Sequence, residues 1–412
     1  MWTGFLGMRI AMIGQKGIPC KGGGVERHVE ELSVELVRAG HEVIVYTRPH
    51  YTRASLTSFH GVTLVSLPSL RAKHFDAITH TLLATLDALR RKVEVIHYHG
   101  VGPALLSWIP RLIAPSVRVV GTFHSADWLH EKWGIVARGI LRAGAYMISA
   151  APHVTIGVSR DIVRMVKAYT GRRALYIPSG VRISETAPSR TCLKRFKLES
   201  VPYVLVVSRF VKHKCIHEAL EAFVRMKEHP RLPRHLRAVK LVLVGGSAFT
   251  DSYVAALKAQ AQGRKDIVFT GFQNGETLHA LYAHASAFVQ PSVAEGRSIS
   301  LMEAAAWGVP VAAADITETR ELLVPGGIHK KPLGTLFPPH DVEALGIALR
   351  VLLTRRAAAL RMGARAREYV KKAYPWGTIA GWIDAVYIRL GAHEMSFGDI
   401  EYALAQAETK IP

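Results

Sequence analysis

The chain has 412 residues, enough for two to three domains with their own hydrophobic cores. This length excludes a mini-protein that depends on disulfides or a structural metal for its stability. With 49% hydrophobic and 21% charged residues, it is not expected to be intrinsically disordered. The net charge of +21 favours polyanionic partners: nucleic acid, acidic lipid headgroups or phosphorylated ligands. Residues 1–185 contain 23 basic and 12 acidic residues, and residues 186–412 contain 30 basic and 20 acidic residues. The positive charge is therefore spread over both halves and is not concentrated in a basic tail.

Short apolar runs rich in β-branched residues alternate with helical stretches from Met8 onward. In the first half we expect strands at 8–14, 41–47, 93–99, 117–124 and 153–159, and in the second at 203–208, 240–246, 266–271, 286–292 and 309–315. The polar, proline-containing segment 183–200 interrupts the alternation and predicts a domain linker.

This α/β pattern predicts two tandem Rossmann-like domains with mostly parallel sheets. We place them at 8–185 and 186–375, followed by a helical segment at 376–412. Ligands are expected at the carboxyl ends of the strands, in a central cleft that the two sheets face.

The three cysteines, Cys20, Cys192 and Cys215, have no paired or metal-type spacing and cannot all form disulfides. This usage favours a reducing compartment and therefore a cytoplasmic location. No run approaches 18 consecutive apolar residues, which argues against a spanning helix. The opening residues 1–7 lack the features of a secretory signal, and Met8 is a second candidate start.

Glycines gather between the first predicted strand and helix, at Gly14, Gly17 and Gly22 to Gly24. Such glycines let the backbone approach a ligand, and the free N–H groups of the helix start bind anions. The spacing is neither the dinucleotide fingerprint nor a P-loop. A flexible connecting loop is the alternative interpretation.

Two cations, Arg209 and Lys214, follow the first strand of the second domain. Cations at a strand end facing a cleft can hold a diphosphate and stabilise its charge as it leaves. Taken in isolation, they are more commonly ordinary surface residues.

Glu295 and Glu303, with seven residues between them, lie in a loop and on the following helix. Carboxylates at two depths of a cleft accept hydrogen bonds from sugar hydroxyls. A helix-capping or surface role is the alternative.

His124 ends the predicted strand 117–124, where side chains meet the cleft. We expect it to contact the transferred group or the acceptor, while a structural histidine is an equal alternative and a metal role is not expected without clustered ligands. His97 and His99 are expected to line the floor of the cleft.

The chain contains no Asp-x-Asp motif that would hold a divalent ion on a nucleotide diphosphate. Protein groups must then neutralise the diphosphate charge, and the groups available are Arg209, Lys214 and the helix N-terminus after Gly296. The sequence therefore predicts that neither a metal nor a cofactor is required.

Together these residues resemble the retaining glycosyltransferases of family 4, which have the GT-B fold. The resemblance covers nearly the whole chain, through the segments 23–43, 122–125, 177–181, 208–214, 269–272, 289–315, 318–323 and 374–376. Its most specific element is the pair of glutamates within 289–315.

The resemblance implies metal-independent, retaining transfer of a sugar from a nucleotide-sugar donor to a glycan or lipid-linked acceptor, in polysaccharide or glycoconjugate biosynthesis. The first domain would bind the acceptor and the second the donor, and the segment after Trp376 would pack back on the first domain. The acceptor would attack the same face that the diphosphate leaves, and the diphosphate would take its proton.

The resemblance also implies roles for single residues. Arg209 and Lys214 would bind the donor diphosphate, Glu295 the donor sugar and Glu303 the nucleotide ribose, and His124 would lie near the transferred sugar. The remaining implied donor-binding residues are Gly22, Gly23, Gly24, Gly271, Phe272, Gly296, Arg297, Ser298 and Ile299.

Two departures from the family pattern concern single positions. Cys215 stands where the family usually has glycine after the lysine, and Arg297-Ser298 stands where it often has Phe-Gly. The second departure places an extra cation beside the phosphate, which bears on the identity of the donor sugar.

Segments 67–92 and 131–151 combine basic residues with apolar helical spacing. They predict peripheral association with the inner face of an anionic membrane, where a lipid-linked acceptor would be found. Helices that pack on a Rossmann sheet and keep a solvated basic face are the alternative.

Two competing functions follow from the same residues. A nucleotide-sugar epimerase of this fold would need no acceptor, whereas the Gly22 to Gly24 loop and the basic helices favour a transferase. A nucleic-acid-binding protein would show a localised basic face with stacking aromatics, but aromatic residues are only 8% and the charge is spread over both halves.

Overall fold

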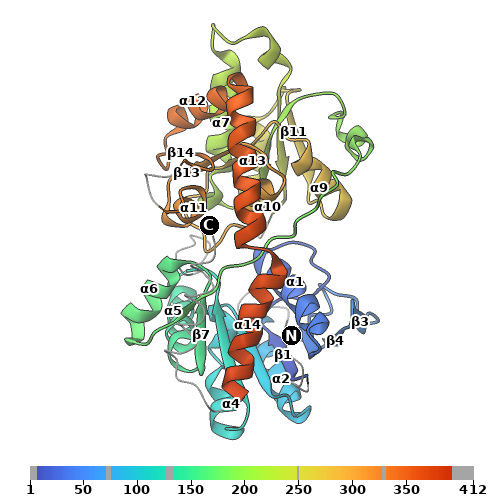
Figure 1. Cartoon of the computed structure of the whole chain (residues 1–412), viewed down its shortest axis with the longest axis vertical. Coiled ribbons are helices and arrows are strands. Elements are labelled where there is room, and N and C mark those ends of the chain that lie inside the picture. Colours follow the sequence, from blue (N-terminus) through green and yellow to red (C-terminus); the bar gives the residue numbers. More distant parts are fainter. Residues whose placement is uncertain are drawn as a thin grey trace. The chain divides into compact units, whose positions relative to one another are not determined.

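The structure is a computed structural model that describes residues 7–70, 76–126, 128, 134–247, 250–326 and 331–391. The chain divides into two compact units (Figure 1). Unit 1 comprises residues up to 180 together with those from 374 onward, and unit 2 comprises 181–373. These divisions lie close to the predicted boundaries at 185 and 375. Among the described residues, no helix has both the length and the apolar character needed to cross a bilayer.

Unit 1 contains an eight-stranded sheet in the order β3-β4-β2-β1-β5-β6-β7-β8, in which only the β3–β4 pair is antiparallel. Its strands are β1 (Arg9–Ile13), β2 (Glu42–Thr47), β3 (Ser58–Phe59), β4 (Val62–Ser66), β5 (Val95–His99), β6 (Arg118–Phe123), β7 (Val154–Gly157) and β8 (Leu175–Tyr176). Its helices are α1 (Gly24–Arg38), α2 (Asp76–Arg90), α3 (Val101–Ala104), α4 (Trp108–Ile113), α5 (Ile135–Ala150), α6 (Arg160–Thr170) and α14 (Trp376–Gly391).

The central strands of unit 1 are continuous apolar runs because helices cover both faces of a parallel sheet. The last four residues of β1 and all of β5 are buried. Helix α1 buries Val29, Leu32 and Leu36, which the helical spacing predicts. A second group of buried side chains, which includes Ile13, Tyr46, Ile96, Phe123 and Ile148, forms a hydrophobic cluster between strands and other helices of this unit.

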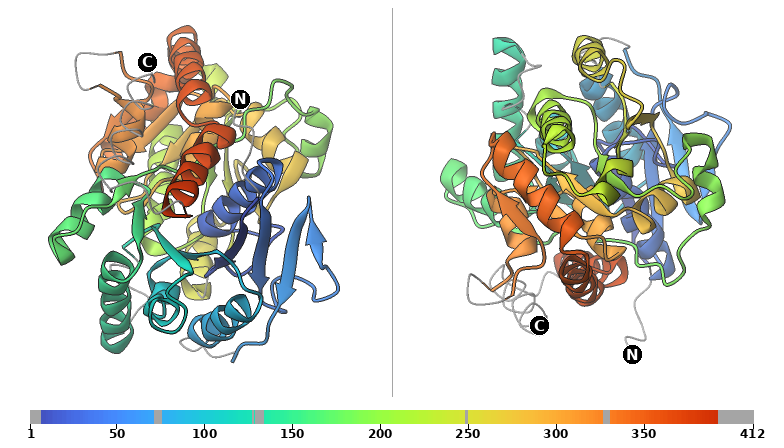
Figure 2. Two further views of the ribbon diagram at one scale, coloured as in Figure 1. Left: turned by 60° about the horizontal axis from the view of Figure 1, so that its bottom comes forward. Right: turned by 90° about the horizontal axis from the view of Figure 1, so that it is seen from above.

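The last described helix, α14, packs against α1 within unit 1 (Figures 1 and 2). His41 is hydrogen-bonded to Asp384 of α14 at 2.8 Å. Gly180 lies so close to the Trp376 ring that a Cβ at this position would approach ring atoms to 2.6 Å. The described part of the segment after Trp376 thus makes these contacts within unit 1.

Unit 2 contains a parallel six-stranded sheet in the order β11-β10-β9-β12-β13-β14. Its strands are β9 (Tyr203–Val207), β10 (Lys240–Val244), β11 (Ile267–Gly271), β12 (Ala287–Gln290), β13 (Val311–Ala314) and β14 (Thr335–Phe337). Its α-helices are α7 (Ile216–Glu228), α8 (Asp251–Gln260), α9 (Gly275–Ala283), α10 (Ile299–Ala306), α11 (Thr317–Leu323), α12 (Val342–Thr354) and α13 (Arg356–Ala373), and its 3₁₀ helices are η2 (Arg190–Phe196), η3 (Lys212–Lys214) and η4 (Arg234–Ala238).

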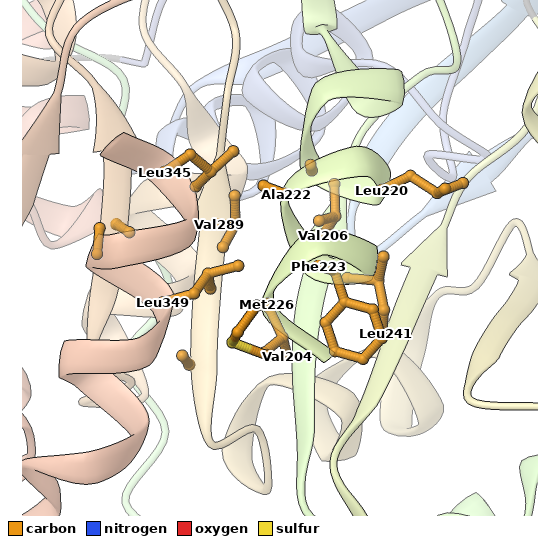
Figure 3. Packing of buried hydrophobic residues seen from close by; sticks show 14 of the residues in the cluster. Val204, Val206, Leu220, Ala222, Phe223, Met226, Leu241, Val289, Leu345 and Leu349 are labelled. Carbon is orange, nitrogen blue, oxygen red and sulfur yellow. The ribbon is translucent and has the colours of Figure 1, made fainter. Parts of the chain in front are cut away.

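Helices α7 and α12 pack side by side over the sheet of unit 2. Figure 3 shows Leu345 and Leu349 of α12 beside Val289 of β12, with Phe223 and Met226 of α7 over the neighbouring strands. These side chains are buried, so the two helices have fixed positions on the sheet. This packing also fixes the position of the turns at which α7 and α12 begin.

All ten predicted strands are confirmed. Strands β3, β4, β8 and β14 were not predicted. Three of them, β3, β8 and β14, have only two or three residues, too few to show a periodicity. The predicted linker 183–200 is wrong, because most of η2 lies in this segment and Leu193 and Leu198 are fully buried within unit 2.

Candidate active site

The carboxyl edge of the unit 2 sheet carries most of the predicted site residues. From β9 the chain proceeds outward to β10 and β11 on one side, whereas β12, β13 and β14 lie on the other. The neighbouring strands β9 and β12 therefore define a topological switch point, where open α/β sheets bind ligands. The loop after β9 holds Arg209 and Lys214, and the loop after β12 holds Glu295 to Ser298.

Lys214 and Glu295 form an ion pair across this switch point. The distance from Lys214 Nζ to Glu295 Oε2 is 2.6 Å, and the side chains are 12% and 9% exposed. The backbone N–H of Val293 donates to the carbonyl of His213 at 3.0 Å, which joins the two loops beside the pair. The structure thus brings together two residues that the sequence predicted separately.

Arg209 lies in the same loop but is exposed. Within the part of the chain that the structure describes, no hydrogen bond or ion pair is made by its guanidinium group. A guanidinium group that is free to reorient can form bidentate hydrogen bonds with a phosphate.

Ser298 caps the N-terminus of α10. Its Oγ accepts a hydrogen bond from Leu301 N at 3.3 Å and donates one to Gln290 Oε1 at 2.5 Å. Gly296, Arg297 and Ser298 are buried, while Ile299 and Glu303, both on α10, are half-buried. Gln290 was not predicted as a site residue, although it is a buried polar residue at the end of an otherwise apolar strand.

Replacing Ser298 by alanine is expected to lower the unfolding free energy of unit 2 by about 1 kcal/mol, because it removes a helix-capping acceptor. The shift in the urea midpoint measures this loss. Ser300→Ala is the comparison within the first turn of α10: its hydroxyl lies 3.2 Å from Ser298 Oγ, and we expect its loss to cost less than half as much. Equal losses in the two variants would contradict the capping role of Ser298.

The structure places Arg297 differently from the sequence expectation of an extra cation beside the phosphate. Its side chain is 1% exposed, and Nη1 lies 3.6 Å from Glu321 Oε2 on α11. The carboxylate of Glu321, itself only 13% exposed, balances the guanidinium charge. Arg297 therefore contributes a buried ion pair beneath the loop that carries Glu295.

Gly271 and Phe272 stand at the same carboxyl edge but at the end of β11, two strands away from β9. Gly271 has φ +68°, a conformation that glycine adopts without strain, and Phe272 is 49% exposed. The structure does not bring these two residues to the Lys214–Glu295 pair.

In unit 1 the glycine-rich connection between β1 and α1 is held by side chains. Gly22 and Gly23 have φ values of +142° and +109°, and Gly24 begins α1. The hydroxyl of Tyr51 accepts a hydrogen bond from Lys21 N at 2.6 Å and donates one to Gly22 O at 3.2 Å. The alternative of a flexible connecting loop is therefore not supported.

His124 belongs to a cluster of buried histidines at the carboxyl edge of the unit 1 sheet. Ring nitrogens of His28, His99 and His124 all lie within 4.8 Å of one another, and His99 Nδ1 is hydrogen-bonded to His124 Nε2 at 3.2 Å. His97 is hydrogen-bonded to Tyr387 Oη at 2.6 Å and to Thr122 Oγ1 at 2.7 Å. The sequence did not predict that histidines cluster around His124.

His28 was missed as a member of this cluster. It lies on the buried face of α1, its Nδ1 is hydrogen-bonded to Ser179 Oγ at 3.0 Å, and its ring packs edge-on against Trp376. The sequence did contain one indication that His28 is buried: it lies on the face of the predicted helix that otherwise carries the apolar residues Val29 and Leu32. The sequence could not show that this face of α1 lies near His99, which ends β5, near His124, which follows β6, and near Trp376 of α14, because these contacts depend on the tertiary structure.

Burial holds the pKa of His97 at about 3 and those of His28 and His99 well below the usual value of 6.5. Because the unfolded chain binds protons at these histidines below about pH 6.5 while the folded chain does not, stability is complete above that pH and falls on acidification. Each such histidine contributes a slope of about 1.4 kcal/mol per pH unit.

Urea unfolding of unit 1 at pH 7 and pH 5 tests this expectation. His97→Gln should reduce the loss of stability between the two pH values, whereas the exposed His60→Gln should leave it unchanged. A pH dependence identical in wild type and His97→Gln would contradict the assignment.

The two halves of the chain match two protein-family models. Residues 22–185 match the family described as Glycosyltransferase Family 4, and residues 193–369 match Glycosyl transferases group 1. The chain is a family 4 glycosyltransferase. Because both matched families consist of glycosyl-transferring enzymes, the epimerase and nucleic-acid-binding alternatives have no support from these matches.

Relatives and solved structures agree with this assignment. The glycosyltransferase is 28% identical over 395 residues to the GDP-mannose-dependent alpha-(1-6)-phosphatidylinositol monomannoside mannosyltransferase of Mycobacterium tuberculosis, covering 88% of this chain and 94% of that protein. Sucrose-phosphate synthase from Thermosynechococcus elongatus superposes with a TM-score of 0.78 at 22% identity, covering 94% of this chain and all of the other. Anabaena HepE in complex with UDP and glucose gives 0.73 at 20% identity, covering 92% and 99%. These structural likenesses identify the fold as GT-B.

Proposed function

We propose that this glycosyltransferase moves a sugar from a nucleotide-sugar donor to a glycan or lipid-linked acceptor, with retention of the anomeric configuration and without a metal. The Lys214–Glu295 ion pair at the switch point of the unit 2 sheet carries the proposal. It supports the proposal because a cation, which suits a diphosphate, and a carboxylate, which suits sugar hydroxyls, lie together at the edge where such sheets bind ligands.

Each candidate residue has a role in this reaction. Arg209 and Lys214 neutralise the donor diphosphate, Glu295 accepts hydrogen bonds from the donor sugar, and Glu303 accepts them from the ribose. The backbone N–H groups after Gly296 add the positive end of the α10 dipole. The remaining residues proposed to bind the donor are Gly22, Gly23, Gly24, Ser298 and Ile299.

The transfer breaks the bond between the anomeric carbon and the diphosphate and forms one to the acceptor oxygen on the same face. The acceptor proton passes to the departing diphosphate. His124 is proposed to lie near the transferred sugar. The main contribution of the protein is electrostatic stabilisation of the leaving group, which is strongest in the transition state.

A nucleotide-sugar panel tests the donor assignment. Because the mycobacterial relative is named for GDP-mannose and HepE was solved with UDP and glucose, GDP-mannose and UDP-glucose come first. A true donor at a hundredfold excess over its Kd raises stability by about 2.7 kcal/mol. Glu295→Ala or Arg209→Ala should abolish this shift and product formation, and a panel without any shift would contradict the proposal.

Independence from metal is tested by measuring product formation after treatment with EDTA and removal of the chelator. We expect the rate to be unchanged on adding Mg²⁺ or Mn²⁺. A strict requirement for a divalent ion would contradict the assignment of the diphosphate charge to Arg209 and Lys214.

A lipid-linked acceptor would require unit 1 to reach a membrane surface. Apolar side chains are exposed on helices of this unit, most strongly Ile135 (89%) and Val136 (78%) at the start of α5 and Leu112 (69%) on α4. Exposed arginines, Arg111 and Arg142, lie on the same two helices. We propose that these helices rest on the anionic inner face of the cell membrane, where each well-placed base adds about 1 kcal/mol.

Co-sedimentation with phosphatidylglycerol and phosphatidylcholine vesicles tests this surface. Binding should require the acidic lipid, weaken with salt and be lost in Ile135→Asp/Leu112→Asp. Leu360→Asp, an equally drastic change at an exposed position of unit 2, is the control and should bind like wild type. Binding that is indifferent to acidic lipid and salt would contradict the proposal.

A further inference from the structure

Three side chains of metal-ligand type converge where α7 and α12 begin in unit 2. Cys215 immediately precedes α7, Glu218 lies in its first turn, and His340 lies two residues before α12. The Cys215 thiol sulfur, a Glu218 carboxylate oxygen and a His340 ring nitrogen all lie within 4.8 Å of one another. Glu218 Oε1 and His340 Nδ1 are 2.7 Å apart.

The backbone at two of these residues is left-handed. Cys215 has φ +49° and His340 has φ +64°, a region that is unfavourable for an L-residue and that glycine adopts easily. Both strained positions therefore carry a side chain that can ligate a metal, and both direct it to the same carboxylate. Glycine at either position would remove a ligand and relieve the backbone.

The set of donor atoms matches the preferences of zinc. A tetrahedral Zn²⁺ with bonds of about 2.0–2.3 Å to nitrogen, oxygen and sulfur requires ligand atoms roughly 3.3–3.8 Å apart. The three atoms lie within 4.8 Å of one another, and the 2.7 Å between Glu218 and His340 would have to lengthen when an ion takes the place of their hydrogen bond. Thiolate with imidazole selects zinc over Mg²⁺ and Ca²⁺, which prefer sites made only of oxygen ligands. The His340 side chain is 66% exposed, which gives an ion a path from solvent.

The surroundings supply further support for a bound cation. His217 Nε2 lies 3.8 Å from Glu218 Oε1, while its Nδ1 is hydrogen-bonded to the hydroxyl of Tyr253 at 2.9 Å. A histidine oriented through one ring nitrogen presents the other toward a metal, as outer hydrogen bonds commonly arrange. With three ligands from the protein, the fourth coordination position would be taken by water.

We propose that Cys215, Glu218 and His340 form a zinc-binding site in unit 2. On binding, the Cys215 sulfur gives its proton to solvent and the hydrogen bond between Glu218 and His340 is replaced by two bonds to the ion. The site goes beyond the proposed transfer reaction, because no step of that reaction uses the metal.

Titration of the metal-stripped protein with Zn²⁺ against a chromogenic chelator tests the proposal. We expect one equivalent to bind and to raise the thermal unfolding temperature. Co²⁺ in its place should give a thiolate-to-cobalt absorption band. Cys215→Gly and His340→Gly should each weaken binding by more than about 100-fold, and Cys215→Gly should also remove the band.

Two matched variants serve as controls. Cys192→Ser changes the half-exposed cysteine of the same unit, and His60→Gly changes an exposed histidine that also has a positive φ of +48°. Both should bind Zn²⁺ like wild type. Glycine suits the left-handed backbone at both positions, and cooperative urea unfolding of metal-free Cys215→Gly and His340→Gly shows that these variants still fold.

Absence of binding in wild type, or binding that survives in both glycine variants, would overturn the proposal. The second result would place the ion elsewhere, for example at His28, His99 and His124. The test needs neither donor nor acceptor, so its failure leaves the proposed transfer reaction unaffected.

Discussion

Replacing Lys214 by alanine is expected to lower kcat about 10²- to 10³-fold, with a smaller effect on donor KM. The reason is that negative charge builds on the diphosphate as the sugar leaves, and a preplaced cation stabilises this charge by about 3–4 kcal/mol. Initial rates of product formation at varied donor concentration measure the effect. Lys214→Arg should restore part of the rate, because it keeps the charge but changes its geometry.

The neighbouring Lys212 supplies a matched control for this prediction. It lies in the same 3₁₀ turn, η3, and is exposed, whereas Lys214 is half-buried against Glu295. Lys212→Ala should retain the wild-type rate to within about twofold, as expected for an exposed cation. Comparable losses in both variants would show that the turn, and not the Lys214 ammonium, is the important feature.

A double-mutant cycle shows whether Lys214 and Glu295 act together. If the ion pair orients both groups toward one donor, Lys214→Ala combined with Glu295→Gln should cost clearly less than the sum of the two single losses. Additive losses would mean that the two residues contact the donor independently.

Replacing Arg297 by methionine is expected to lower the unfolding free energy of unit 2 by about 3 kcal/mol. This change leaves the mostly buried carboxylate of Glu321 without the guanidinium that balances its charge. Urea unfolding, followed by hydrogen exchange in peptides of α10 and α11, reports the loss for this unit separately. That separation matters because a chain of two units need not unfold in one step.

The second partner of this pair supplies the critical comparison. In Arg297→Met/Glu321→Leu most of the lost stability should return, since apolar residues replace both charges. Arg320→Met is the control, because Arg320 pairs with Asp315 at the surface and should contribute less than about 1 kcal/mol. Equal effects of Arg297→Met and Arg320→Met would contradict the importance of burial.

Residue patterns along the chain were enough to predict the two parallel sheets. Continuous apolar runs such as 203–208 and 240–246 form strands that are buried on both faces, and this burial is the physical reason why the pattern is readable. The short strands β8 and β14 were not predicted, because two or three residues are too few to show a periodicity of apolar residues. The segment 183–200 was misread because its polar residues mask two leucines, Leu193 and Leu198, that are fully buried.

The sequence could not predict which side chains contact one another. Lys214 and Glu295 were each predicted, but their contact depends on β9 and β12 being neighbours although β10 and β11 intervene in the chain. Arg297 was predicted as a cation beside the donor phosphate, because no local pattern shows that α11 places the carboxylate of Glu321 next to its guanidinium group.

By itself, the sequence determined the fold class, the family resemblance and the residue types available for binding a nucleotide sugar, because these follow from local periodicity and motif spacing. Tertiary structure alone decided which charges are balanced, that four histidines meet at one edge of unit 1, and that Cys215, Glu218 and His340 converge in unit 2. These outcomes depend on strand order and helix packing, which join residues distant in the chain and carry no local signal.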